Sequence, residues 1–390
     1  MSQQTEDRQT SEKKPFWTTA WGPEYVSPYE RWKAEQGLDT VRGWIAENLY
    51  TVELKDWPAR GARGVFINLE GNEGFNDSYV CEIPPGKSTN PMHHIYEDTV
   101  FILSGRGATS VWYEESKKQT FEWKNWSYFA IPPNAWYQHH NGSGTEPARF
   151  VGMTGAPRVI NSFKDLEFVF ENPYRFKDRF DDQAGYFGAN SSEKIRDSYR
   201  LVTNFVADVE AVTARADDPK AKGPRGVRTT GVRFEMINST MKSHSSEWPV
   251  GTYMNCHRHG PGLHIIILRS KGYSLLWKDD FKDRVRVDYG PGSMFVPPEM
   301  YWHQHFNTGP EPLLHLAAGW GSEKPKKGGG SYYYISQGAS GDSDAVWGGE
   351  DVITILDEDP AIHREFEEEL AKSGVPCNMG QVHPYCTFKD

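Results

Sequence analysis

Short stretches rich in apolar and β-branched residues recur along the chain, separated by turn residues. In the second half, Leu263–Leu268 and Tyr273–Trp277 are two such stretches, and the charged segment Lys278–Asp283 follows them. A similar pair runs from Phe101 to Trp112 in the first half. Runs of this length and composition are typical of β-strands joined in hairpins. The pattern therefore predicts a mainly β protein.

The two halves of the chain also repeat each other, at a separation of about 162–166 residues. Such a long and constant separation indicates two homologous domains rather than a short-period repeat. The matching segments are Gly61–Val65 with Gly223–Val227, Ile131-Pro132-Pro133 with Val296-Pro297-Pro298, and Trp136-Tyr137-Gln138-His139 with Trp302-His303-Gln304-His305.

Capping residues and apolar spacing predict the elements outside the repeated halves. A proline at the first helical position after a serine or an aspartate marks a helix start, and a glycine after the last turn marks an end. Apolar residues recurring every three or four positions mark an amphipathic helix. These signals predict a helix from Ser27, a strand over Tyr50–Leu54, an amphipathic helix over Lys194–Arg215, and a helix from Asp359-Pro360 to Ala371 with Gly374 beyond its end.

Turn-rich segments then divide the chain into five parts. We expect an N-terminal extension with a short helix (1–60), a first barrel (61–160), a connector with a helix (161–222), a second barrel (223–322) and a C-terminal extension with a helix (323–390). The polar residues 1–14 are expected to be disordered, and Lys324–Gly330 is expected to be a solvated loop.

Composition narrows the class of protein without naming a function. The 390 residues carry a net charge of −10, so neither nucleic acid nor an anionic membrane surface is an expected partner. The chain lacks an apolar run of about 18 residues and begins with a polar segment, which predicts a soluble protein without a secretory signal. Four scattered cysteines fit a reducing cytoplasm, and the many aromatic residues favour a homo-oligomer.

Histidines gather at the two ends of one segment, Gly251–Asn307. His257 and His259 are two residues apart, so on a strand they project to the same side, whereas Cys256 faces the other side and is expected to pack in the core. A hairpin path through the following strands returns His303 beside this pair. Three neutral imidazoles suit iron, zinc, copper or nickel better than calcium or magnesium.

These residues resemble a known family. Gly251 is followed, after five residues, by His257-x-His259. Gly292 is followed by Pro298 after five residues, then by His303 after four and by Asn307 after three. These two spacings are similar to the paired motifs of the cupin superfamily. The resemblance implies a bicupin: two tandem cupin barrels of the double-stranded β-helix or jelly-roll type, with peripheral helices. It makes His257, His259 and His303 the metal ligands. Many cupins carry a fourth ligand, a glutamate, at the position that Leu263 occupies here. The replacement of that glutamate resembles the three-histidine iron dioxygenases of the superfamily.

The first half departs from this metal pattern. Met92 and Tyr137 occupy the positions that match His257 and His303. A thioether and a protonated phenol are poor ligands for divalent ions, so we expect a structural, metal-free first barrel. The alternative is a different metal site built from His94, Asp98 and His139.

The second motif is also similar to that of gentisate-type ring-cleaving dioxygenases. This resemblance implies an iron(II)-dependent dioxygenase whose partners are dioxygen and a small chelating, phenolic substrate, with His264 or His305 as the catalytic proton shuttle. Ile265 stands where these enzymes place a carboxylate-binding arginine, so a less carboxylated phenol or a diketone is as good a candidate as gentisate. The alternatives are a lyase, isomerase or hydrolase with zinc, manganese or nickel, and a noncatalytic binding bicupin.

Overall fold

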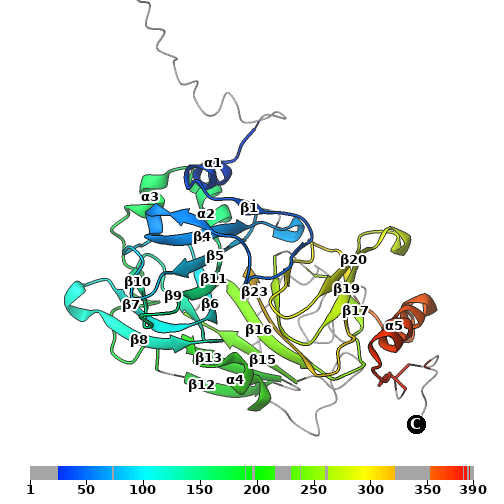
Figure 1. The fold of residues 1–390 in the computed structure, drawn as a ribbon. Coiled ribbons are helices and arrows are strands. Elements are labelled where there is room, and N and C mark those ends of the chain that lie inside the picture. The colour runs from blue at the N-terminus through cyan, green and yellow to red at the C-terminus, as the bar shows by residue number, and fades with distance from the viewer. Residues whose placement is uncertain are drawn as a thin grey trace, which may run out of the picture.

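The computed structural model describes residues 25–72, 74–188, 190–195, 198–215, 230–237, 239–259, 262–320, 352–380, 382–383 and 386. Two β-domains lie side by side, the first built mainly from the first half of the chain and the second from the second half (Figure 1). Residues 1–14 and 324–330, for which disorder and a solvated loop were predicted, lie outside the described residues. No helix in the described ranges is long and apolar enough to cross a membrane.

The first domain consists of a large sheet and a smaller one. The large sheet has the order β1 (Thr40–Val41), β4 (Ala62–Ile67), β5 (Asp77–Ile83), β11 (Ala148–Thr154), β6 (Asp98–Ser104), β9 (Tyr128–Ile131) and β14 (Phe205–Val206), and β3 (Lys55–Trp57) also pairs with β4. The smaller sheet has the order β10 (Trp136–Asn141), β7 (Arg106–Trp112) and β8 (Gln119–Lys124).

The second domain repeats this plan. Its large sheet has the order β12 (Asn190–Ile195), β13 (Ser198–Thr203), β15 (Thr230–Glu235), β16 (Met241–Trp248), β23 (Leu313–Trp320), β18 (His264–Arg269), β21 (Met294–Phe295) and β2 (Ile45–Ala46). Its other sheet has the order β20 (Val285–Tyr289), β19 (Gly272–Trp277), β22 (Trp302–Asn307), β17 (Cys256–His257) and β24 (Val352–Ile353).

The same strand order therefore occurs twice. The series β5, β11, β6, β9 in the first domain corresponds to β16, β23, β18, β21 in the second, and β10, β7, β8 corresponds to β22, β19, β20. Two antiparallel sheets paired in this way form the double-sheet jelly roll of a cupin barrel. The predicted mainly β fold of two tandem cupin barrels is thus confirmed by the strand order itself.

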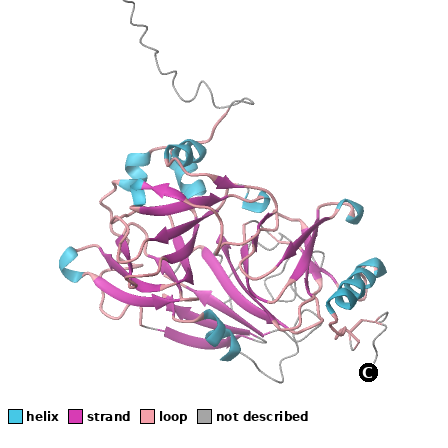
Figure 2. Cartoon of the chain, in the orientation of Figure 1, coloured by secondary structure: helices cyan, strands magenta, loops and turns pink. Residues whose placement is uncertain are grey.

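Helices lie at the periphery of the two barrels, as Figure 2 shows. Their bounds are α1 (Pro28–Glu35), α2 (Ala156–Phe163), α3 (Leu166–Phe170), α4 (Val209–Arg215) and α5 (Pro360–Ser373), and short 3-10 turns span Pro58–Arg60, Glu70–Asn72, Glu115–Lys117 and Phe281–Asp283. The predicted starts of α1 and α5 are confirmed, because Ser27 and Asp359 cap them. Helix α5 runs to Ser373, two residues beyond the predicted Ala371, and Gly374 follows it with a φ of 65° as expected.

Two predicted elements are wrong. The predicted helix over Lys194–Arg215 is replaced by β12, β13 and β14, and only Val209–Arg215 is helical. Residues 50–54, predicted as a strand, form a turn and an irregular segment before β3. In the first place, parallel pairing of β13 with β15 determines the conformation more strongly than the local apolar spacing does. In the second, the pairing with β4 begins only at Lys55.

Segments outside the predicted barrel boundaries connect the two barrels. From the N-terminal extension, β2 pairs with β21 of the second barrel, and from the connector β14 pairs with β9 of the first. The apolar core between the two large sheets is continuous, since Ile266 and Leu316 of the second barrel belong to the same buried cluster as Phe101 and Val151 of the first. The barrels are therefore packed as one unit.

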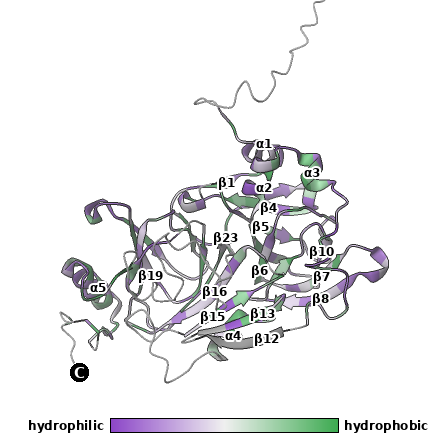
Figure 3. Ribbon diagram, turned by 180° about the vertical axis from the view of Figure 1, so that it is seen from behind, coloured by the Kyte–Doolittle hydropathy of each residue, from purple (hydrophilic) through white to green (hydrophobic). Residues whose placement is uncertain are grey.

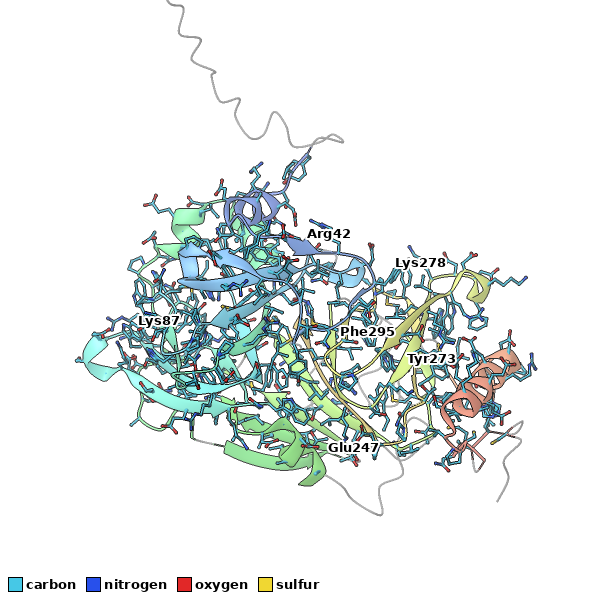
Figure 4. All side chains as sticks on the ribbon, viewed as in Figure 1. Arg42, Lys87, Glu247, Tyr273, Lys278 and Phe295 are labelled. Carbon is cyan, nitrogen blue, oxygen red and sulfur yellow. The ribbon has the colours of Figure 1, made fainter. Side chains whose placement is uncertain are left out.

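A separate apolar cluster fills the inside of the second barrel, and a third lies between its outer sheet and α5. Figure 3 shows both hydrophobic and hydrophilic residues along α5, in keeping with one buried face formed around Phe366 and Leu370. Figure 4 shows Phe295 within the second barrel, whereas Tyr273 lies on the side of β19 nearer to α5.

Candidate metal centre

Pairing of β17 with β22 creates the candidate centre. It places His257 directly opposite His303, with ring centroids 4.3 Å apart. His259, in the loop that follows β17, lies 4.7 Å from His303 by the same measure. His305 projects from the same face of β22 as His303, since it is two residues further along, and its ring centroid is 5.4 Å away. The predicted return of His303 to the His257 pair is seen.

Four imidazoles therefore gather at one end of the barrel interior. One nitrogen each from His257, His303 and His305 forms a group whose atoms all lie within 4.8 Å of one another. His259 borders this group, with its ring 5.7 Å from that of His257. The residues predicted as ligands and the predicted proton shuttle His305 thus share one site, and an all-imidazole donor set of this kind fits a borderline transition-metal ion.

Backbone carbonyl groups fix the protonation of two of these rings. His257 Nδ1 lies 3.2 Å from the carbonyl oxygen of Asn255, and His303 Nδ1 lies 2.9 Å from that of Tyr301. A carbonyl can only accept a hydrogen bond, so in each neutral ring the proton resides on Nδ1 and Nε2 keeps its lone pair. A hydrogen bond of this type orients metal-binding histidines and increases their basicity.

The third ring, His305, is held by a side-chain hydroxyl. Its Nδ1 lies 2.6 Å from Ser274 Oγ. A hydroxyl can both donate and accept, so this contact orients the ring in either tautomer. His305 is buried and stacks on Trp248 with ring centroids 5.3 Å apart.

Spacing alone did not reveal Ser274 or Trp248 as part of this site. The one sequence signal available was a polar residue within the otherwise apolar strand Tyr273–Trp277.

The structure corrects the expectation for His264. Its strand neighbours Ile265 and Ile267 face the interior of the second barrel, whereas His264, Ile266 and Leu268 face the first barrel. His264 Nε2 lies 3.1 Å from the amide nitrogen of Asn72, and Nδ1 lies 3.3 Å from the Ala318 carbonyl oxygen. Burial lowers the pKa of His264 to about 4, so the ring is neutral. This side chain belongs to the contact between the barrels and not to the histidine site.

The matching place in the first barrel holds a cation of the protein itself. An isolated bridge pairs Met92 with Tyr137, as β17 pairs His257 with His303 in the second barrel. The buried Arg60 guanidinium donates to the Tyr79 hydroxyl at 3.0 Å, and Tyr79 donates to Asp98 at 2.7 Å. A fixed positive charge opposes the binding of a second cation nearby.

The residues of the alternative first-barrel site have other partners. His94 Nε2 lies 2.9 Å from the Tyr137 hydroxyl, and burial together with the nearby Arg60 charge lowers its pKa to about 3. Burial raises the pKa of Asp98 to about 7, which disfavours its ionised, metal-binding form. Among the described residues of the first barrel, no three histidine, cysteine or acidic side chains form a metal-capable group.

A histidine–hydroxyl pair is nevertheless preserved in both barrels. His139 Nδ1 lies 2.8 Å from Thr109 Oγ1, which also accepts a hydrogen bond from Trp123 Nε1 at 2.9 Å. The corresponding His305 has the Ser274 hydroxyl in this place, and one of its ring nitrogens also belongs to the group formed with His257 and His303.

Arginines that could bind a substrate carboxylate are engaged elsewhere. The Arg258 guanidinium stacks over the Trp302 ring, with its central carbon 4.5 Å from the ring centroid. Arg269 forms ion pairs with Glu210 and Glu247. Ile265, at the position of the arginine in gentisate-type enzymes, belongs to the apolar cluster inside the barrel.

Comparisons with known proteins found distant structural likeness alone. No protein-family model matches the chain, and no curated protein does. A structure of Bacillus subtilis oxalate decarboxylase is 13% identical over 72% of this chain and 77% of that one, with a TM-score of 0.45. Vicilin from hazelnut, Corylus avellana, is 12% identical over 71% of this chain and 85% of that one, with a TM-score of 0.43. At this level of similarity the comparisons assign no activity, metal or substrate.

Proposed function

We propose that the protein is a metal-dependent enzyme that uses iron(II) to oxygenate a small, chelating, phenolic substrate inside the second barrel. The observation that carries the proposal is the convergence of His257 and His303, each with Nε2 fixed as a lone pair, next to two further imidazoles. Leu263, at the place of a fourth carboxylate ligand, keeps this ligand set neutral. Such a set leaves open coordination positions for a substrate.

Iron(II) held by neutral imidazoles supplies Lewis acidity and one-electron reactivity toward dioxygen. The protein supplies the rest of the chemistry. His305, oriented by Ser274 and close to the rings of His257 and His303, is placed to accept the proton of a phenolic hydroxyl. The apolar side chains of Ile265, Leu276 and Phe295 line the same barrel and exclude water from an aromatic ring. His264 has no part in this proposal.

Two ligand sets share His257 and His303 and differ in the third member. We propose His259 as the third ligand and His305 as the base, because His257 and His259 match the His-x-His motif and the Ser274 hydroxyl already orients His305. Replacing His259 by alanine is then expected to release the metal, while His305→Ala keeps the metal and lowers kcat by about 10²–10⁴-fold. If His305→Ala instead lost the metal and the His259 variant kept it, His305 would be the third ligand.

The test is elemental analysis of anaerobically purified protein, followed by oxygen uptake with dihydroxylated aromatic compounds and β-diketones. We expect about one iron per chain and oxygen uptake that depends on one class of these substrates. Zinc, manganese or nickel together with no oxygen uptake, even after reconstitution with iron(II), would overturn the oxygenase and point to a lyase, isomerase or hydrolase. A chain that binds no metal would contradict the enzyme proposal as a whole.

A further inference from the structure

A second group of metal-binding side chains lies outside both barrels, in the C-terminal extension. His363 and Glu367 stand one turn apart on α5, and Cys377 and Cys386 follow that helix. One donor atom from each of the four residues lies within 4.8 Å of all the others. The spacing of the two cysteines, with eight residues between them, matches no common motif, so only the folded structure reveals the group.

The separations within this group match a tetrahedral ion. The Cys377 and Cys386 sulfur atoms are 3.5 Å apart, and His363 Nε2 lies 3.2 Å from Glu367 Oε1. Metal bonds of about 2.0 Å to nitrogen or oxygen and about 2.3 Å to sulfur place tetrahedral neighbours roughly 3.3–3.8 Å apart. A disulfide requires a sulfur–sulfur distance of about 2.05 Å, so the two thiols are not so joined.

A hydrogen-bond relay prepares His363 as a ligand. Tyr253 donates its hydroxyl proton to Glu358, and the same hydroxyl lies 3.0 Å from His363 Nδ1. Since the tyrosine proton is already used, its oxygen accepts the proton on His363 Nδ1, and Nε2 is left with a lone pair toward Glu367 and the cysteines. This carboxylate–tyrosine–histidine arrangement orients the ring as outer partners do in metal sites.

The group is largely shielded from solvent. His363 is 1% exposed, Cys377 5% and Cys386 3%, and the Glu367 side chain is 15% exposed. The two cysteines belong to the apolar cluster that contains Phe366 and Leu370. Four protein ligands in a closed, apolar surrounding are typical of structural zinc sites, whereas catalytic sites keep a position for water. Two sulfur donors also favour zinc over manganese or magnesium.

The site has a clear structural role because the extension contacts the histidine centre. β24, at the start of the described extension, pairs with β17, with Val352 opposite His257. Glu358 also accepts a hydrogen bond at 2.8 Å from Gln304, which lies between His303 and His305 on β22. An ion that fastens α5 to the segment of Cys377 and Cys386 would therefore hold the outer side of both strands that carry the candidate ligands.

We propose that His363, Glu367, Cys377 and Cys386 form a structural zinc site that fixes the C-terminal extension against the second barrel. The site is independent of the metal in the histidine centre and of the reaction there.

Cobalt substitution of the full-length protein tests this proposal, because only thiolate ligands give sulfur-to-cobalt charge-transfer absorption. We expect that absorption in the wild type and in His257→Ala, together with about one zinc per chain before exchange. The double variant Cys377→Ser/Cys386→Ser is expected to lose both signals and to keep the metal of the histidine centre. Cys81→Ala, which removes a buried thiol of the first barrel, is the matched control and should keep both signals.

Titration of the wild-type protein with an organomercurial reagent covers the case in which the double variant does not fold. Zinc should be released in proportion to the modification of about two thiols. Absence of thiolate–cobalt absorption in the wild type, a Cys377–Cys386 disulfide found by mass spectrometry of the unreduced protein, or zinc release that does not follow thiol modification would each overturn the proposal. None of these results depends on oxygenase activity.

Discussion

At the scale of single residues, the surroundings of one histidine distinguish the two barrels. His139 of the first barrel pairs with the Thr109 hydroxyl and His305 of the second with the Ser274 hydroxyl. His305 shares a metal-capable group with His257 and His303, whereas His139 lies beside Tyr137 and near the Arg60 charge. The second barrel is therefore the one suited to metal chemistry.

Replacing Ser274 by alanine should lower activity by about 10–100-fold, because His305 loses the hydrogen-bond partner that orients its ring. Steady-state oxygen uptake, with metal content measured on the same sample, checks this expectation. Thr109→Ala removes the corresponding hydroxyl of the first barrel and should leave activity near that of the wild type. Equal activity of Ser274→Ala and wild type would show that the Ser274 hydroxyl has no role in the reaction.

His264 gives a pH prediction. Its folded-state pKa, about 4, is below the ordinary value of 6.5, so between these values the unfolded chain binds the additional proton. Stability therefore rises with pH from about 4 to 6.5 and is lost as the pH falls, with a contribution of about 1.4 kcal/mol per pH unit.

In His264→Gln the slope of unfolding free energy against pH should be shallower by about 1.4 kcal/mol per pH unit between about pH 4 and 6.5. Urea unfolding at a series of pH values measures it. The variant should also keep kcat within a few-fold of wild type, since the side chain lies between the barrels. An unchanged slope, or a large loss of kcat with stability preserved, would contradict this assignment.

At the scale of elements, β19 and β22 must approach closely for the histidines to meet. A Cβ atom on Gly272 would lie 1.8 Å from the carbonyl oxygen of Phe306, one residue beyond His305. At the matching place in the first barrel, a Cβ atom on Gly107 would lie 2.0 Å from the carbonyl oxygen of His140. Only glycine permits this contact, so the repeat extends to the backbone packing between strands.

Gly272→Ala should cost about 1–3 kcal/mol of stability and weaken metal binding, because β22 must move away from β19. Thermal unfolding and metal titration of the purified variant measure both effects. Gly290→Ala is the control, since a Cβ atom there meets nothing within 4 Å. Metal affinity unchanged in Gly272→Ala would mean that the histidine cluster does not depend on this strand contact.

Elements specified by local chemistry were predictable from the sequence. Ser27 and Asp359 cap their helices through side-chain oxygens, and the apolar strands β18 and β19 have the expected positions. Lys194–Arg215 was not predictable, because its apolar residues have helical spacing while β13 is held by parallel pairing with β15. Strand pairing over a long sequence separation leaves no local signal.

The histidine site was predictable for a different reason. His257, His259 and His303 are signalled by motif spacing, and strand pairing then brings them together. The face of His264 was not predictable, since that requires the first residue of β18 and the direction of its alternation. The side chains of the proposed zinc site come from a helix and two later segments, so no spacing rule joins them.

At the scale of the whole molecule, two similar barrels share one apolar core but differ in their interior charge. The first contains the buried Arg60 guanidinium beside Tyr79 and Tyr137, and the second contains the neutral histidine cluster. The first barrel then serves as a rigid partner, joined to the second through β2, β14 and the packed large sheets. Because the histidine cluster lies in the second barrel and a buried arginine in the first, we predict one catalytic metal centre per chain.

The measurement that tests this account most directly is the metal content of matched alanine variants, purified anaerobically and saturated with iron(II). His303→Ala should lose the iron of the second barrel, and His94→Ala, at the equivalent interior of the first barrel, should retain all of it. Full iron in His303→Ala, or loss of iron in His94→Ala with the fold intact by circular dichroism, would contradict the assignment of a single histidine centre to the second barrel.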